Sequence, residues 1–252
     1  MSAMTESAAA APRVTVVVPV RNEAGNVAAL VGEIENALAA HAPFEIIYVN
    51  DGSSDATPGE LRKLMAARPH LRVISHQQSC GQSAAVRTGV RAARAPLVIT
   101  LDGDGQNDPA FMPDFLLAMD AAGETCGLVQ GQRTGRKDTG FKKFQSRVAN
   151  GVRSRVLQDG TRDTGCGFKC FRREAWLALP YFDAVHRFTP ALMRREGWDI
   201  AYVDVIDRPR FTGVSNYGFL DRLWVGIVDL MGVRWLIKRR KRIPQASEAE
   251  RS

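Results

Sequence analysis

The chain has 252 residues, of which 45% are hydrophobic and 24% are charged, and this composition excludes a disordered or collagen-like chain. Its length suits one α/β domain with a small appendage. The net charge of +7 is concentrated at one end, because residues 238–242 (KRRKR) carry five positive charges. A nucleic-acid-binding protein usually spreads basic residues over one face, so we expect no nucleic-acid partner.

The N-terminal residues, the cysteines and the most apolar stretch indicate where the protein is located. Residues 1–12 are rich in alanine and serine and lack the apolar core of a signal peptide, so we expect a disordered tail. The four cysteines have neither the spacing of a disulfide framework nor that of a zinc site, which favours a reducing, cytoplasmic environment. The most apolar stretch, residues 219–237, is interrupted by four charged residues and does not suit a membrane span.

Strand and helix patterns alternate through the first hundred residues. Strands are expected at residues 14–18, 44–49, 71–75 and 96–101, and helices at 27–41, 61–67 and 84–93. This alternation predicts an α/β fold with a Rossmann-like, mixed but mainly parallel central sheet. In such sheets, ligands bind beyond the carboxyl ends of the strands.

The second half of the chain is less regular. Short strands are expected at residues 128–131, 167–171 and 201–206, and helices at 141–157, 186–196 and 219–240. We therefore expect one domain over residues 13–217, a C-terminal amphipathic helix with a basic end over 218–242, and a tail over 243–252.

Three polar segments follow predicted strands: residues 19–23 (PVRNE), 50–55 (NDGSSD) and 102–104 (DGD). They are expected to meet at one sheet edge. Two carboxylates two residues apart can offer hard oxygen ligands to Mg²⁺ or Mn²⁺, and a divalent cation there would stabilise a diphosphate leaving group. The alternative for the third segment is a solvated Asp-Gly turn, and for the first two it is helix capping.

Side-chain chemistry assigns candidate roles in these segments. Gly103 lets the backbone turn between Asp102 and Asp104, and Gln106 can add an amide oxygen to a cation site. Asp51 can accept hydrogen bonds from a base N–H or a ribose hydroxyl, and Glu23 can do the same at the first strand.

Taken in this order, the segments resemble glycosyltransferase family 2, and most closely its dolichyl-phosphate mannosyltransferase-like, polyprenyl-phosphate glycosyltransferase branch. Further matching segments are residues 146–150 (SRVAN), 163–168 (DTGCGF), 186–190 (HRFTP) and 210–215 (RFTGVS). The resemblance runs from about residue 14 to residue 217. It implies a GT-A fold that transfers a hexose, with mannose favoured, from a GDP- or UDP-linked sugar to a polyprenyl phosphate with inversion.

The same resemblance implies roles for individual residues. The donor nucleotide would be held by Pro19, Arg21, Glu23, Asp51, Asp102 and Gly103, and Mg²⁺ or Mn²⁺ by Asp102, Asp104 and Gln106. The catalytic set would be Asp104, Arg133, Arg147, Arg210 and Asp163. Arginine suits phosphate because its planar fork binds two oxygens at once. The alternatives are a surface charge for each arginine and a turn carboxylate for Asp163, and Arg21 stands where the family frequently has an aromatic residue.

The acceptor decides the mechanism. A lipid phosphate is already anionic and can attack directly, whereas a hydroxyl needs a general base, for which Asp163 is the candidate. The alternatives to a polyprenyl phosphate are therefore a hydroxyl of a lipid or glycan, or no transfer at all in a nucleotide-sugar-binding module. The acidic set and the arginines argue against the module, because binding alone does not require a cation at a leaving group.

The C-terminal segment predicts where the protein acts. Residues 219–237 place a wide apolar face and two tryptophans before the basic run. This pattern favours a helix lying in the interface of an anionic membrane, on its cytoplasmic face. The alternative is a helix packed on the protein's own core with a solvated basic tail.

Overall fold

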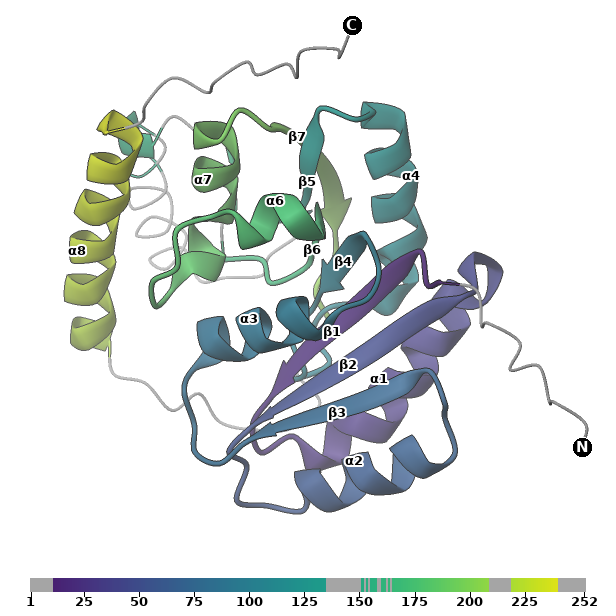
Figure 1. Ribbon diagram of the computed structural model, residues 1–252. Helices are drawn as coiled ribbons and strands as arrows, with labels where there is room; N and C mark the ends of the chain where they lie inside the picture. Colours follow the sequence, from purple (N-terminus) through teal and green to yellow (C-terminus); the bar gives the residue numbers. More distant parts are fainter. Residues whose placement is uncertain are drawn as a thin grey trace, which may run out of the picture.

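A seven-stranded mixed sheet forms the centre of the molecule (Figure 1). The computed structural model describes residues 11–134, 151, 153, 155–157, 160–161, 163, 165–208 and 219–239. The strands are β1 (Val14–Val20), β2 (Phe44–Asp51), β3 (Leu71–His76), β4 (Leu97–Thr100), β5 (Cys126–Arg133), β6 (Lys169–Arg172) and β7 (Asp199–Val205). They lie in the order β3-β2-β1-β4-β6-β5-β7.

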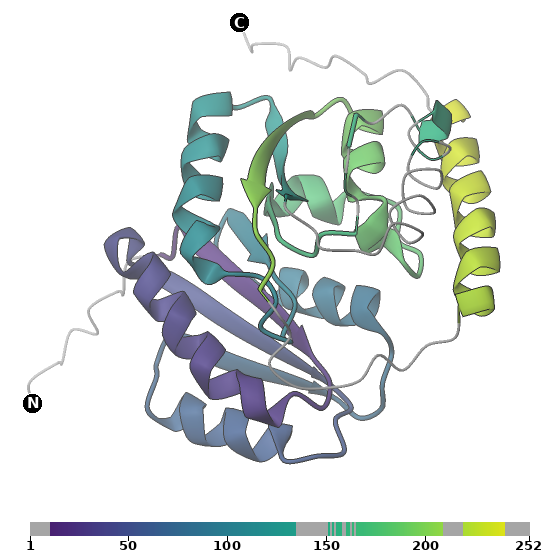
Figure 2. The same cartoon turned by 180° about the vertical axis from the view of Figure 1, so that it is seen from behind.

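Helices cover both faces of this sheet, as Figures 1 and 2 show. They are α1 (Ala24–Leu38), α2 (Thr57–Ala66), α3 (Gln82–Ala92), α4 (Met112–Ala122), α6 (Arg173–Leu177), α7 (Thr189–Arg195) and α8 (Phe219–Lys238), with short 3₁₀ turns at Ala39–His41, Pro109–Phe111 and Val185–Arg187. One core packs α1, α2 and α4 against the sheet, and the other packs α3, α6 and α7 against the opposite face. Because both faces are covered, the central strands β1 and β4 are almost wholly apolar, with Thr15 and Thr100 as their polar residues.

One strand runs against the others. β6 is antiparallel to both of its neighbours, β4 and β5, whereas the remaining pairs are parallel. Its first residue, Lys169, pairs with Thr100 on β4 and with Gln130 on β5. The amino end of β6 therefore lies at the same edge as the carboxyl ends of the other six strands. The reversal adds the segment before β6 to the edge where ligands of parallel sheets bind.

The predicted α/β architecture with a mixed, mainly parallel sheet is confirmed. Two helices, α4 and α6, were not predicted. The predicted helix over 141–157 lies mostly outside the described residues, although residues 151, 153 and 155–157 are helical. The expected tails over 1–12 and 243–252 also fall almost wholly outside them.

The C-terminal helix α8 packs on the outside of the molecule beside α7 (Figure 1). Val233 is buried in the core that contains α7, and Arg195 of α7 donates a hydrogen bond of 3.0 Å to the Leu236 carbonyl. Its opposite side exposes apolar side chains, with Met231 67% and Trp235 59% exposed. The helix therefore both packs on the protein's own core and presents an apolar strip outward. No described helix is long and apolar enough to cross a membrane.

Candidate active site

The loops after β1 and β2 are joined by hydrogen bonds. The Asn22 amide carbonyl accepts from the Ser54 backbone N–H at 2.8 Å, and the Asn22 N–H donates to Ser53 Oγ at 2.9 Å. Asp55 accepts from the N–H of Thr57, the first residue of α2, at 2.9 Å, although the N-cap position itself is held by Ala56. These contacts fix the two neighbouring loops as one polar unit at the edge of the sheet.

Asp51, the last residue of β2, organises the loop that precedes α3. Its carboxylate accepts from the backbone N–H groups of Cys80 at 2.8 Å and Gly81 at 2.9 Å, and from the Ser79 hydroxyl at 2.7 Å. The His76 ring lies 2.7 Å away. Burial alone would raise the pKa of Asp51, but these hydrogen bonds outweigh it and lower the pKa. Asp51 is therefore a charged, fixed acceptor at the predicted nucleotide site.

The acidic segment after β4 is held from several sides. Asp104 is buried and accepts from the Gln106 N–H at 3.1 Å. The side chain of Asn107 accepts from the Asp102 N–H at 3.0 Å and donates to Asp207 at 3.2 Å. A Cβ at Gly103 would lie 2.3 Å from Val20 Cγ1, so the glycine is required by close packing on β1. The left-handed backbone of this segment lies at Gly105 (φ 75°) rather than at Gly103.

Asp102 lies in a tight setting next to this segment. Gln82 Nε2 donates to its Oδ1 at 2.7 Å, and a Cβ at Gly167 would come within 2.5 Å of both carboxylate oxygens. Burial first, and then the charge of Asp104, raise the pKa of Asp102 to about 6. The fold therefore holds this carboxylate in place at an electrostatic cost, which a bound cation would remove.

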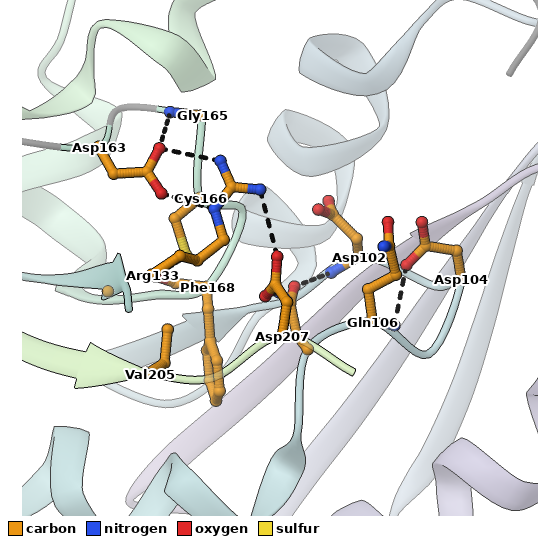
Figure 3. Close-up of polar contacts among 12 residues, drawn as sticks. Asp102, Asp104, Gln106, Arg133, Asp163, Gly165, Cys166, Phe168, Val205 and Asp207 are labelled. Carbon is orange, nitrogen blue, oxygen red and sulfur yellow. Dashed lines mark hydrogen bonds and ion pairs between the residues drawn. The ribbon is translucent and has the colours of Figure 1, made fainter. Parts of the chain in front are cut away.

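Arg133, at the end of β5, lies between two carboxylates (Figure 3). It donates to both oxygens of Asp163, at 2.5 and 2.9 Å, and to Asp207 at 3.3 Å. The hydrogen bond to Asp163 is the largest of the influences that raise the pKa of Arg133. Arg133 is largely buried, so its interpretation as a free surface charge is wrong.

The structure brings most of the predicted residues to one edge. Pro19 lies in β1, Glu23 accepts from Asn26 at 2.6 Å at the start of α1, and Arg21 is exposed between them. Arg147 and Arg210 lie outside the described residues. The sequence interpretation missed four residues that contact or neighbour the acidic segment: Gln82, Asn107, Lys169 and Asp207.

The side chains at this edge fit a hard divalent cation. Figure 3 shows Asp104 and Gln106 side by side, with Asp102 next to them. Carboxylate and amide oxygens are the ligands that Mg²⁺ and Mn²⁺ prefer. The close packing of Gly167 against Asp102 and the raised pKa of Asp102 are consistent with a cation-binding position.

A second group of ligand atoms lies nearer to β2. Within the described part of the chain, ligand atoms of Asp51, His76 and Cys80 lie within 4.8 Å of one another. His76 is already engaged on both ring nitrogens, by Asp51 at 2.7 Å and by the Thr88 hydroxyl at 2.9 Å. These hydrogen bonds indicate that the three residues hold the loop before α3 in place.

Comparison with known proteins places this site in a family. The sequence model of glycosyl transferase family 2 matches residues 15–177, which is most of the sheet and includes the acidic segment. The chain belongs to glycosyl transferase family 2. This finding confirms the resemblance and agrees with the order of the polar segments along the chain.

Two curated relatives are similar over most of this chain. One is the dodecaprenyl-phosphate galacturonate synthase of Rhizobium johnstonii, 33% identical over 90% of this chain and 68% of that protein. Another is the undecaprenyl-phosphate 4-deoxy-4-formamido-L-arabinose transferase of Pectobacterium carotovorum, 33% identical over 82% of this chain and 63% of that protein. The chain thus spans about two thirds of the length of these relatives.

Solved structures share the fold. The glucosyl-3-phosphoglycerate synthase of Mycobacterium tuberculosis, in complex with Mn²⁺, UDP and phosphoglyceric acid, superposes with a TM-score of 0.66 and 20% identity, over 93% of this chain and 80% of that one. Its complex with Mg²⁺ and UDP gives a TM-score of 0.65 and 19% identity, over 91% and 79%. This likeness confirms the expected GT-A fold.

The close approach of Gly167 to Asp102 yields one prediction. Gly167→Ala adds a methyl group within 2.5 Å of both Asp102 oxygens, so the carboxylate must shift from its present position. We expect the affinity for Mn²⁺ and nucleotide, measured by calorimetry, to fall by at least about tenfold while the fold is kept. Gly59→Ala, where nothing lies within 4 Å, is the matched control. Unchanged affinity in Gly167→Ala would show that Asp102 is not needed at the site.

The raised pKa of Asp102 yields a second prediction. The folded protein holds a proton that the unfolded chain releases near pH 3.8, so the stability contributed by this group falls as the pH rises from about 4 to 6. Asp102→Asn keeps an acceptor for Gln82 but carries no charge. With metal chelated, we expect it to raise the free energy of unfolding by roughly 1–3 kcal/mol at pH 7.5 and by little at pH 4. Urea titrations at both pH values would refute this if the variant is less stable at pH 7.5.

Proposed function

We propose that this protein is a cation-dependent, inverting glycosyltransferase that moves a hexose from a nucleotide-diphosphate sugar to a polyprenyl phosphate. The proposal rests on one observation: Asp102, Asp104 and Gln106 lie at the same edge of the sheet as Arg133 and its two carboxylate partners. Membership of the family and the activities for which the two relatives are named support these classes of donor and acceptor.

The donor half of the site is the edge formed by β1, β2 and β4. Pro19 and Asp51 border the nucleoside position, and the negative Asp51 carboxylate fixes the loop before α3 at that border. Asp102, Asp104 and Gln106 would hold Mg²⁺ or Mn²⁺, and the structural neighbours bound to these ions and UDP support that assignment. When bound, the cation neutralises charge that develops on the leaving diphosphate. The fixed side chains need no rearrangement as that charge develops.

The acceptor half is formed by the ends of β5 and β7. Arg133 uses three N–H groups on Asp163 and Asp207, which leaves two for a phosphate oxygen. For an anionic acceptor to attack, its repulsion from the donor diphosphate must be offset, and its oxygen must point at the anomeric carbon. The positive charge of Arg133 offsets the repulsion. Because Arg133 is fixed between two carboxylates, it can also orient the acceptor oxygen. The assignments of Arg147 and Arg210 to phosphate remain predictions.

A hydroxyl acceptor is the second candidate reaction. It would require Asp163 as a general base, but both Asp163 oxygens accept hydrogen bonds from Arg133 and one also accepts from the Gly165 N–H. Both oxygens are thus already engaged by charged and backbone donors, which leaves the carboxylate poorly placed to accept a proton from a hydroxyl. The geometry around Asp163 therefore favours a phosphate acceptor, which needs no base.

The identity of the sugar and nucleotide is open to a direct screen. The sequence resemblance favours mannose, whereas the relatives are named for galacturonate and for 4-deoxy-4-formamido-L-arabinose. Mannose therefore stays a prediction, as does the choice between GDP and UDP. The screen offers UDP- and GDP-linked sugars with undecaprenyl phosphate and with soluble alcohols, and measures sugar recovered in lipid and aqueous products.

Asp104 provides the central functional prediction. Asp104→Ala removes a buried carboxylate from the proposed cation site, so we expect transfer to fall at least about a hundredfold and cation-dependent donor binding to be lost. Asp114→Ala, at an exposed position of α4, should retain both. Circular dichroism of both variants checks that the fold is kept. Full transfer by purified Asp104→Ala would exclude the proposed cation site.

The outer side of α8 supports a location at an anionic membrane surface, and the cytoplasmic face of that membrane stays a prediction. Ile227, Val228, Met231 and Trp235 are exposed there. Lys238 and Arg239 follow, and the Arg239 guanidinium lies 5.9 Å from the centre of the Trp235 ring. Apolar side chains bordered by basic residues suit the boundary between acyl chains and anionic headgroups.

Vesicle sedimentation tests this location. We expect the protein to sediment at low salt with vesicles that contain phosphatidylglycerol, because each nearby basic residue contributes about 1 kcal/mol. Met231→Ser with Trp235→Ser, or replacement of residues 238–242 by glutamine, should release it. Leu117→Ser, an exposed position on α4 far from α8 in Figure 1, is the control. Equal sedimentation of all variants, or no sedimentation of the wild type, would contradict the proposed surface.

A further inference from the structure

A small cavity opens beside Asp102, on the face of the sheet covered by α3 and α7. Its lining includes Pro19, Gln82, Asp102, Lys169 and His186. With a volume of about 20 Å³, it has room for roughly one water-sized group. The cavity therefore suits a single substituent of a bound molecule, and is too small for a diphosphate or a whole sugar ring.

The one cationic side chain that lines this cavity is Lys169, which is only 3% exposed. Its Nζ donates to the Cys166 carbonyl oxygen. That oxygen also receives Gln130 Nε2 at 3.4 Å, so an ammonium group is not needed to satisfy it. Lysine carries three N–H donors, and a buried ammonium with one neutral partner is costly.

Lys169 has no close negative partner among the described residues. No carboxylate in that part of the chain lies at ion-pair distance from its Nζ. Burial lowers the pKa of Lys169, and the charges of Asp102 and Asp163 offset this only in part, from farther away. His186, held by Ser83 at 2.7 Å, has its pKa lowered to about 3, first by burial and then by Lys169, so the ring is neutral. If Asp102 shares in holding a divalent cation, its negative charge no longer offsets that of Lys169.

We propose that Lys169 recognises a carboxylate on the donor sugar, which makes the preferred donor a nucleotide-linked hexuronate. The inference rests on the proposed function, because it places the sugar beside Asp102. One oxygen of a carboxylate is small enough for the cavity, and the carboxylate supplies the negative partner that the buried ammonium lacks. Lys169 is then a residue that determines donor specificity, and it takes no part in the chemical step.

Matched donors that differ only at the sixth carbon test the proposal. Calorimetry with Mn²⁺ compares UDP-galacturonate with UDP-galactose, and GDP-mannuronate with GDP-mannose, with UDP and GDP as references. We expect wild type to bind the uronate of one pair roughly 10- to 100-fold more tightly than its neutral partner. Lys169→Met should abolish this preference and leave the affinity for the free nucleotide within about twofold. Lys63→Met, at an exposed lysine of α2, should keep the preference.

Each outcome separates this inference from the proposed function. Equal binding of uronate and neutral donors by the wild type overturns the inference, and this comparison does not depend on any variant being folded. If Lys169→Met weakens UDP or GDP as much as the uronate, Lys169 contacts the diphosphate and the inference also fails. If wild type binds no UDP or GDP compound in the presence of Mn²⁺, the proposed function itself fails.

Discussion

Repulsion between carboxylates at one edge of the sheet is the constraint on which the arrangement of the site depends. Asp102 and Asp104 lie at the end of β4, and close by Arg133 lies between Asp163 and Asp207. Arg133 forms ion pairs with both members of the second pair, although burial still raises the pKa of Asp207. For the first pair, the raised pKa of Asp102 shows the cost. A site arranged in this way is stabilised when a cation and its anionic ligand enter together.

The reversed strand β6 connects the two halves of the edge. Because it runs against β4 and β5, its amino end brings Gly167 against Asp102 and Lys169 into the cavity beside it. The chain segment before β6 also carries Asp163, the partner of Arg133. Donor recognition, cation binding and acceptor binding are thus proposed to depend on the same short stretch of chain.

Periodicity and strand-end position predicted the architecture and the shared edge, because both depend on local patterns. Helix α4 was missed although Met112, Phe115, Leu116 and Met119 have helical spacing. Asp207 follows the last strand in the same way as Asp102 follows β4, so the same rule could have identified it. The partners of Arg133 could not be predicted, since they come from segments 30 and 74 residues away in the chain. The proposed role of Lys169 depends on the burial of its side chain. A single lysine in a predicted apolar strand does not show whether that side chain is buried.

The position of the cation tests the central claim most directly. A crystal of this protein grown with Mn²⁺ and UDP or GDP would show the ion in an anomalous difference map. Our account predicts a peak in contact with Asp104, at the edge formed by Asp102 and Gln106, with the nucleotide diphosphate beside it. A peak at Asp51, His76 and Cys80 instead, or a bound nucleotide with no ion at Asp104, would contradict the account.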